Sequence, residues 1–267
     1  MPDGEFNALL TYLRDARGFD FTGYKPSSIE RRLRRRMEAV GIESYDAYRD
    51  HLEVHQDEFG ELFNTILINV THFFRDPEAW EVIASRAIPA ILNTRPSGAP
   101  IRVWSVGCAS GEEAYTAAML LAEALGAAQF SERVKIYGTD VDDEALDEAR
   151  QGTYDAERLE GVPDDLRARY FERLGQRYAF RKDLRRSMIF GRNNLTQDAP
   201  ISRIDLLICR NTLMYFNGET QGQILRRLHF ALQPTGFLLL GKSEMLLTRR
   251  ELFEPVDMRR RASHMST

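Results

Sequence analysis

The stretch Val103–Leu121, VWSVGCASGEEAYTAAMLL, decides the fold of this chain. Its apolar start predicts a buried strand, its glycines predict a turn, and a helix follows that opens on Glu112 and Glu113. Such a turn usually holds an anion, because the free N–H groups and the dipole of the helix N-terminus favour negative charge. Here the two glutamates already occupy that position, and no lysine accompanies them. The stretch therefore argues against a nucleotide triphosphate and favours a ligand with hydroxyl groups or positive charge.

The composition is that of an ordinary globular protein. The chain has 267 residues, of which 43% are hydrophobic and 28% are charged, and its formal net charge is −4. This length allows one large domain or two modest ones. The sequence has no apolar run of about 18 residues and no secretory pattern at its N-terminus, so we expect a cytoplasmic protein without membrane insertion. The net acidity disfavours nucleic acid as a partner.

The cysteines exclude two further classes of site. Cys108 and Cys209 are too few for a disulfide framework and lack the spacing of metal ligands. We therefore expect reduced, buried thiols and no metal site.

Breaker residues suggest two domains. Residues 1–92 are predicted to be helical, with Ser27 or Ser28 capping a helix that buries Ile29, Leu33 and Met37. Asp76 and Pro77 are expected to begin the last helix of this domain. The stretch NTRPSGAP, residues 93–100, is the predicted linker.

The pattern changes from residue 101 onward. Strands and helices alternate in residues 101–267, which predicts a mainly parallel sheet covered by helices. Short alternating strands at about 152–190 indicate a small antiparallel β insertion within this domain. The tail RRRASHMST, residues 259–267, is expected to be disordered.

Two features, a glycine loop and an aspartate at a strand end, favour a nucleoside ligand. Gly107 and Gly111 bracket the turn, and Ala109 stands where dinucleotide and methyltransferase loops often have a third glycine. Asp140 ends the second predicted strand, where a carboxylate can accept hydrogen bonds from ribose hydroxyls, although it could equally cap the next helix. A nicotinamide dinucleotide and S-adenosylmethionine are both candidates. The acidic loop exit and the missing glycine disfavour a pyrophosphate, whereas a sulfonium tolerates nearby carboxylates.

Five motifs occur in a fixed order: NVTHFFRDPEAW (69–80), RVWSVGCASGEEAYTAAML (102–120), YGTDVDDEAL (137–146), FGRNNL (190–195) and DLLICRNTLMYFN (205–217). In these motifs the chain resembles, over nearly its whole length, the CheR family of bacterial chemotaxis-receptor methyltransferases. The resemblance implies an α/β fold: a class I S-adenosylmethionine-dependent methyltransferase domain, Rossmann-like, joined to an N-terminal all-helical domain. It also implies transfer of a methyl group to glutamate side chains of chemoreceptors, which forms γ-methyl esters.

The same resemblance implies the residues of the site. S-adenosylmethionine is the expected cofactor and S-adenosylhomocysteine the product, and the residues expected to bind them are Asn69, Thr71, Arg75, Gly107, Glu113, Asp140, Asn194, Leu195, Arg210 and Asn211. Tyr215 matches an aromatic position near the transferred methyl group and is, with Arg75, the expected catalytic residue. The Tyr215 ring could instead simply pack at the sheet edge. Arg75 could form a bidentate pair with the cofactor carboxylate, or a surface ion pair with Asp76 or Glu78.

This chemistry suits a chain without an evident catalytic base. A glutamate side chain has an unperturbed pKa of about 4.3 and is ionised at neutral pH, so its methylation needs no proton acceptor. We expect catalysis mostly from alignment of the reacting atoms in a closed, dry site.

A basic cluster gives a further expectation. Five of the six residues 31–36 are arginine, namely Arg31, Arg32, Arg34, Arg35 and Arg36. Such a run is usually a solvated helix face, but five arginines exceed what solubility requires. We expect them to dock on the acidic cytoplasmic domain of a chemoreceptor, with the chain as a monomer by default.

Two other functions stay open. One is a signalling module that binds S-adenosylmethionine without transferring its methyl group. The other is a nucleic-acid methyltransferase, although the chain has no Asn/Asp-Pro-Pro-Tyr-type motif.

Overall fold

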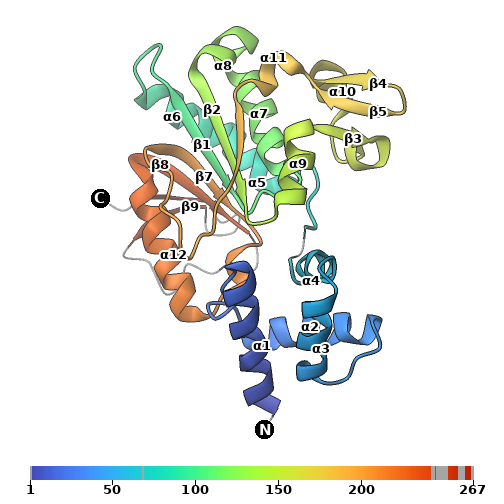
Figure 1. Cartoon of the computed structure of the whole chain (residues 1–267). Helices are drawn as coiled ribbons and strands as arrows, with labels where there is room; N and C mark the ends of the chain where they lie inside the picture. The colour runs from blue at the N-terminus through green and yellow to red at the C-terminus, as the bar shows by residue number, and fades with distance from the viewer. Residues whose placement is uncertain (1, 68, 242–243, 245–251, 258–261, 266–267) are drawn as a thin grey trace. The chain divides into compact units, whose positions relative to one another are not determined.

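The computed structural model describes residues 2–67, 69–241, 244, 252–257 and 262–265 (Figure 1). Its contacts divide the chain into two compact units. The helical unit comprises Met1–Asn69 and Tyr215–Gln221, and the sheet unit comprises Val70–Met214 and Gly222–Thr267. Within the described part of the chain, no helix is long and apolar enough to cross a membrane.

The helical unit contains α1 (Pro2–Arg17), α2 (Pro26–Ala39), α3 (Tyr45–Val54) and α4 (Glu58–Ile66). The predicted apolar stripe of α2 is confirmed, because Ile29, Leu33 and Met37 are buried. The predicted cap at Ser27 or Ser28 is wrong. Pro26 takes the first helical position, where its fixed φ and missing N–H are tolerated, so the helix begins before both serines.

The sheet unit is an α/β structure. Its helices are α5 (Pro77–Val82), η1 (Ile83–Ala87), α6 (Ile88–Thr94), α7 (Glu112–Leu125), α8 (Ala127–Arg133), α9 (Asp143–Gln151), η2 (Ala156–Leu159), α10 (Asp164–Tyr170), α11 (Lys182–Arg185), η3 (Leu213–Tyr215, whose last residue belongs to the helical unit) and α12 (Gly218–Ala231, which begins in the helical unit). Its strands are β1 (Ile101–Val106), β2 (Val134–Asp140), β3 (Thr153–Asp155), β4 (Phe171–Leu174), β5 (Arg177–Phe180), β6 (Met188–Arg192), β7 (Ile204–Cys209), β8 (Leu232–Leu240), β9 (Phe253–Asp257) and β10 (Ala262–Met265).

The large sheet confirms the predicted parallel arrangement. Its strand order is β6-β2-β1-β7-β8-β10-β9. The first five strands pair in parallel, with β1 between β2 and β7. Strands β10 and β9 add an antiparallel edge.

The C-terminal edge corrects one expectation. Residues 262–265 form β10 on the free edge of β8, where unpaired backbone N–H and C=O groups accept another strand. The prediction of disorder is therefore wrong for these four residues. The rest of that stretch, 259–261 and 266–267, lies outside the described residues.

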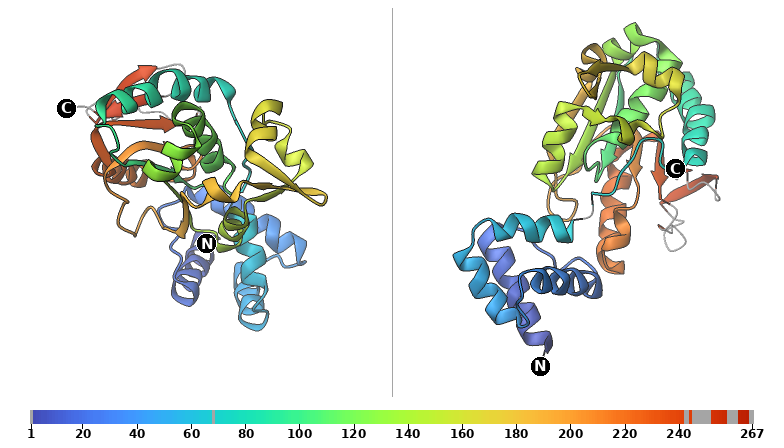
Figure 2. Two further views of the ribbon diagram at one scale, coloured as in Figure 1. Left: turned by 90° about the horizontal axis from the view of Figure 1, so that it is seen from above. Right: turned by 90° about the vertical axis from the view of Figure 1, so that its right-hand side faces the viewer.

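The predicted antiparallel insertion is present as a three-stranded sheet of order β3-β5-β4. We call residues 153–180, which contain this sheet with η2 and α10, the insertion. Figures 1 and 2 show it to one side of the large sheet. Strand β6 falls within the range 152–190 expected for the insertion but pairs with β2 in the large sheet.

The helices before β1 pack on the large sheet. Trp80, Ile88 and Ile91 share one buried core with Ile101 and Val103 of β1. The compact division accordingly falls at residue 69, before α5, and differs from the sequence-based boundary at residue 92. Residues 93–100, expected as a linker, hold the end of α6 and the turn into β1.

Candidate active site

The glycine loop, residues 107–111, connects β1 to α7. Gly107 has φ +64°, and a Cβ there would lie 2.4 Å from the Thr212 Oγ1 atom. Gly111 has φ +94°, and Ala109 is also left-handed at φ 46°. Glycine at 107 is therefore required twice, by the backbone conformation and by the close approach of Thr212.

Asp140, at the end of β2, holds this loop in place. Its Oδ2 atom accepts from the Ala109 N–H at 2.8 Å. Its Oδ1 atom accepts from the N–H groups of Val141 at 2.7 Å and Asp142 at 3.1 Å. Asp142 caps α9 with its own side chain, so Asp140 is not the helix cap. Since a carboxylate has about four lone-pair positions, one is left on Asp140 for a ligand hydroxyl.

Burial raises the pKa of Asp140, although the three backbone N–H donors oppose this shift. Asn193, just after β6, donates its N–H to the Asp140 carbonyl oxygen at 2.9 Å. The ends of β2 and β6 therefore meet at the glycine loop.

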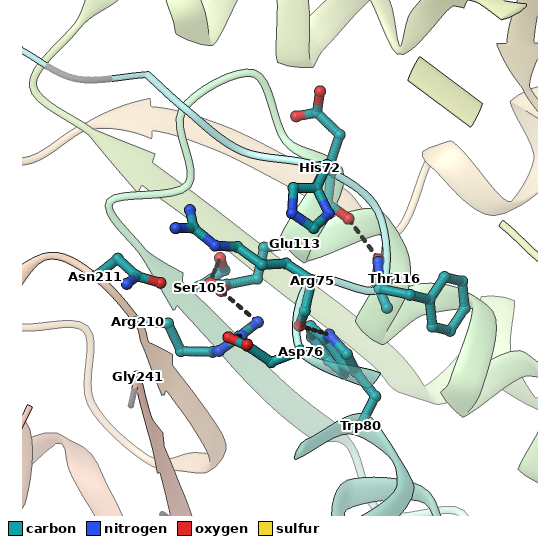
Figure 3. A network of polar contacts seen from close by, with 12 residues as sticks. His72, Arg75, Asp76, Trp80, Ser105, Glu113, Thr116, Arg210, Asn211 and Gly241 are labelled. Atoms are coloured by element: carbon teal, nitrogen blue, oxygen red, sulfur yellow. Dashed lines mark hydrogen bonds and ion pairs between the residues drawn. The ribbon is translucent and has the colours of Figure 1, made fainter. Parts of the chain in front are cut away.

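A network around Arg210 lies at the ends of β1 and β7 (Figure 3). The Arg210 guanidinium is 2.5 Å from an Asp76 carboxylate oxygen and 3.7 Å from a Glu113 carboxylate oxygen. Ser105 of β1 donates its hydroxyl to Glu113 at 2.8 Å, and the Trp80 ring lies against the guanidinium. Only 2% of the Arg210 side chain is exposed. One buried cation thus joins two carboxylates from distant segments.

The electrostatics of Glu113 follow from this burial. Desolvation raises the pKa of Glu113 to about 7, although the Arg210 charge and the Ser105 hydroxyl both act to lower it. Near neutral pH, Glu113 is therefore divided between its two forms. A cationic group nearby would favour the carboxylate.

Two buried polar atoms of this network lack a hydrogen-bond partner among the described residues. They are Nε of Arg210 and Oδ1 of Asn211. A buried unpaired donor or acceptor costs about 1–3 kcal/mol, so such atoms are rare unless a ligand or water satisfies them. One donor and one acceptor suit a polar ligand such as the amino-acid part of S-adenosylmethionine. The residues therefore fit the expected cofactor.

Glu244 fixes the loop that carries Arg210 and Asn211. Its carboxylate accepts from the backbone N–H groups of Asn211 at 3.0 Å, Thr212 at 2.7 Å, Leu213 at 2.6 Å and Gly241 at 2.7 Å. Its side chain is buried. Sequence reasoning missed this residue, whose only signal was a carboxylate three residues after the glycine that follows an apolar strand.

Asp76 was predicted as a helix start or as a surface partner of Arg75, and its contact with Arg210 was not predicted. It does precede α5, but it has φ 54° and its side chain makes no capping hydrogen bond. The carboxylate pairs with Arg210 instead.

The segment before α5 carries Thr71 and Arg75. Thr71 is half-buried, and Arg75 donates a guanidinium N–H to the Val70 carbonyl oxygen at 2.7 Å. The Phe74 N–H donates to the Thr116 hydroxyl of α7 at 3.2 Å, which fixes the segment on that helix. The positive charge of Arg75 also acts to lower the pKa of Glu113.

Asn194 and Leu195 follow β6. Asn194 is buried, and its Oδ1 atom accepts from the N–H and the hydroxyl of Thr196 at 3.0 and 2.7 Å. Leu195 is half-buried, and its carbonyl oxygen accepts from Arg227 at 3.2 Å. The side-chain oxygen of Asn194 thus stabilises a local turn, which leaves the side-chain NH₂ group for a ligand.

Asn69 and Tyr215 belong to the helical unit. Asn69 is exposed. Tyr215 accepts a hydrogen bond from the Lys25 N–H at its carbonyl oxygen, at 2.9 Å. The Arg32 guanidinium lies over the Tyr215 ring, 5.0 Å from the ring centroid. The structure therefore brings together one expected catalytic residue and one expected docking residue.

The five arginines of α2 differ in their surroundings. Arg36 forms a bidentate pair with the buried Glu58, at 2.8 and 2.6 Å, and Arg32 donates to the Ile66 carbonyl oxygen. Arg34 is exposed and pairs with Glu30 at 2.9 Å. Arg31 and Arg35 are exposed and make no ion pair with the described residues. The view of the run as one solvated face is therefore wrong for Arg32 and Arg36, which stabilise the helical unit.

Within the sheet unit, the predicted residues meet at one edge of the large sheet. Gly107, Glu113, Asp140, Arg210 and Asn211 all lie at or just after the carboxyl ends of β1, β2 and β7. In open parallel sheets, ligands bind in the crevice at this edge, where neighbouring strands connect in opposite directions. Among the described residues, no group of three or more His, Cys, Asp or Glu side chains could hold a metal ion.

Comparisons with known proteins agree with this arrangement. Residues 69–262 match the model of the CheR methyltransferase SAM-binding domain, and residues 4–67 match that of the CheR methyltransferase all-alpha domain. The chain is 33% identical to chemotaxis protein methyltransferase 2 of Pseudomonas aeruginosa over 258 residues. This aligned region covers 94% of this chain and 90% of that protein. The chain is 32% identical over 253 residues to the chemotaxis protein methyltransferase of Salmonella typhimurium, covering 91% and 84%.

A third relative is longer. An uncharacterized 104.1 kDa protein of Rhodobacter capsulatus is 37% identical over 242 residues, which are 91% of this chain and a quarter (25%) of that protein. Two family models together cover nearly the whole chain, and relatives above 30% identity extend over most of its length. With its parallel sheet and its all-helical N-terminal part, the chain belongs to the CheR methyltransferase family, whose cofactor is S-adenosylmethionine.

Proposed function

We propose that this chain transfers the methyl group of S-adenosylmethionine to glutamate side chains in the cytoplasmic domain of chemoreceptors. The observation that carries this proposal is the buried network of Glu113, Arg210 and Asp76 beside the loop held by Asp140. It offers carboxylates to hydroxyl and ammonium groups. The relatives named chemotaxis protein methyltransferases support the receptor as substrate. Modification of that receptor domain would occur in the cytoplasm, with the chain acting as a monomer.

S-adenosylmethionine, when bound, supplies a methyl group on a sulfonium; a glutamate oxygen bonds to its carbon as the carbon–sulfur bond breaks, leaving a neutral ester and a neutral thioether. Because the attacking carboxylate is already ionised, the chain needs no proton acceptor. Its own residues bind and orient. Asp140 accepts from a ligand hydroxyl, Glu113 balances the ligand ammonium, and Arg75 pairs with the ligand carboxylate.

The remaining roles are supported by the family pattern. It supports Asn69, Thr71, Asn194 and Leu195 as cofactor contacts, and Tyr215 as a catalytic residue beside the reacting methyl group. For the receptor, the exposed Arg31 and Arg35 offer the positive charge that would attract an acidic helical bundle.

The test uses S-adenosylmethionine tritiated in its methyl group and chemoreceptor cytoplasmic fragments from the same genome. We expect label in the fragment that mild base releases as volatile methanol, which is characteristic of a carboxyl ester. Fragments whose methylatable glutamates are changed to glutamine are the control and should stay unlabelled. Cofactor binding without methyl transfer would favour the signalling module. Base-stable label in added nucleic acid would favour a nucleic-acid methyltransferase.

The pH dependence of product binding tests the role of Glu113. With its pKa raised to about 7, Glu113 is mostly protonated at pH 6 and mostly ionised at pH 8. If the carboxylate form binds the ammonium group, the affinity for S-adenosylhomocysteine should rise about tenfold between these pH values and then level off. Titration calorimetry in buffers of different ionisation enthalpy should detect proton release near pH 7.

Two variants make this measurement specific. Glu113→Gln cannot ionise and should lose the pH dependence, together with much of the affinity. Glu78→Gln changes an exposed carboxylate on α5 and should keep the full dependence. An unchanged pH dependence in Glu113→Gln would contradict the assigned role.

A further inference from the structure

The insertion is bonded directly to the glycine loop. Arg158 of η2 donates to the Ser110 hydroxyl at 2.5 Å and forms an ion pair with Glu112, the first residue of α7. Tyr154 of β3 donates its hydroxyl to the Ser110 carbonyl oxygen at 2.7 Å. Ser110 in turn donates to Glu112 at 2.9 Å. The end of the loop is thus held by side chains about 45 residues further along the chain.

Burial makes these contacts consequential. The Glu112 side chain is 0% exposed, and its one ion pair among the described residues is with Arg158. A buried carboxylate that loses its partner costs about 3–5 kcal/mol, so Glu112 strongly favours the arrangement in which Arg158 reaches it. Tyr154 is also fully buried, with the Arg158 guanidinium 5.0 Å from its ring centroid. Arg158 contacts Glu148 of α9 as well, at 2.9 Å.

The insertion also holds the segment that carries Thr71 and Arg75. The Phe73 ring meets the rings of Tyr154 and Phe171 edge to face, at 5.0 and 5.5 Å between centroids. A Cβ at Gly161 would lie 2.8 Å from the Phe73 carbonyl oxygen, so this glycine allows the close approach. The insertion therefore contacts two segments of the proposed site, one before β1 and one after it.

We propose that Arg158 and Tyr154 are positioning residues, through which the insertion sets the conformation of the glycine loop and hence the affinity for the cofactor. The inference rests on the proposed cofactor site and adds an energetic link between that site and the insertion. Because such a link is reciprocal, cofactor binding must stabilise the insertion by the same factor by which an intact insertion strengthens cofactor binding.

The first measurement is the affinity for S-adenosylhomocysteine by calorimetry. Arg158→Lys keeps the positive charge, but an ammonium group lacks the planar guanidinium that reaches Ser110, Glu112 and Glu148 together. This variant should bind S-adenosylhomocysteine about tenfold more weakly. Tyr154→Phe removes a single hydrogen bond of about 1 kcal/mol and should weaken binding about fivefold. For S-adenosylmethionine turnover, KM should rise while kcat at saturation stays within about twofold, because the residues act on binding alone.

Arg158→Ala leaves Glu112 without its partner and can fail to fold, so the double variant Arg158→Ala/Glu112→Gln removes the pair without leaving a buried charge. The double variant should fold, and its loss of affinity for S-adenosylhomocysteine should be at least as large as that of Arg158→Lys. Arg173→Ala is the matched control. Arg173 lies on β4 of the same small sheet, and among the described residues its side chain donates to the Gly175 carbonyl oxygen alone, so its loss should leave affinity unchanged.

The second measurement is hydrogen exchange of the insertion amides with and without S-adenosylhomocysteine. Saturating ligand should slow exchange in β3 and η2 of the wild-type chain, and less so in Arg158→Lys. A purely structural arginine would not give this ligand-dependent difference. The inference is overturned if the Arg158 and Tyr154 variants keep wild-type affinity for S-adenosylhomocysteine, or if Arg173→Ala loses as much affinity as they do. It is also overturned if the ligand leaves hydrogen exchange of the insertion amides unchanged. Failure of the wild-type chain to bind S-adenosylhomocysteine would instead overturn the proposed cofactor site.

Discussion

Replacing Glu244 by glutamine is expected to lower the free energy of unfolding by about 3 kcal/mol, because four backbone N–H groups then lose a shared carboxylate. Glutamine keeps one oxygen acceptor, but its amide NH₂ must face N–H donors that it cannot satisfy. Burial raises the pKa of Glu244, and the four donors oppose this by favouring the charged form. The measurement is urea unfolding monitored by circular dichroism.

This loss should extend to cofactor affinity. The loop that Glu244 holds also carries Arg210 and Asn211, whose unpartnered polar atoms we assign to the ligand. Glu172→Gln is the matched control, since Glu172 lies exposed on β4. The free energy of unfolding of this variant should stay within about 0.5 kcal/mol of the wild-type value. A Glu244→Gln variant as stable as this control would show that the loop holds its conformation without the carboxylate.

Replacing Asp140 by alanine is expected to weaken the binding of S-adenosylhomocysteine at least about 100-fold. Hydrogen bonds to charged groups contribute about 1.5–3 kcal/mol each, and the variant loses both the ligand hydroxyl contact and the bond to Ala109 that shapes the glycine loop. Titration calorimetry gives the affinity, and thermal unfolding of the free protein separates the loss of binding from a loss of folding.

A neighbouring carboxylate provides the control for Asp140. Asp143→Asn, on the first turn of α9, changes a side chain that is 69% exposed and lies 3.8 Å from Arg192. It should bind S-adenosylhomocysteine as the wild type does. Binding by a folded Asp140→Ala variant within about threefold of the wild type would mean that Asp140 shapes the loop without contacting the ligand.

Much of the fold was predictable because burial leaves a local pattern. The stretches 101–106, 134–140 and 204–209 form β1, β2 and β7, since strands covered on both faces are mostly apolar, although Lys135 of β2 is exposed. Pro77 predicted the start of α5, and Ile29, Leu33 and Met37 predicted the buried face of α2. These features depend on residues within one or two turns of each other.

Local rules failed where a distant partner decides. Asp76 takes the predicted N-cap position of α5, but no local rule indicated that its carboxylate pairs with Arg210, which is 134 residues away. The run of arginines looked uniform, yet Arg36 pairs with Glu58 on another helix. The tail looked disordered, although residues 262–265 complete the sheet by pairing with β8.

The sequence by itself determined the alternation of strands and helices after residue 101, the parallel sheet, the glycine turn with Asp140 at the end of the second strand, and the family, because these are recorded in short motifs and hydrophobic periods. Only the tertiary structure decided that Glu244 holds the Arg210 loop, that Arg158 of the insertion holds Glu112, and that burial raises the pKa of Glu113. The physical reason is that the energy of a buried charge depends on its neighbours in space, and those neighbours come from segments that no local pattern connects.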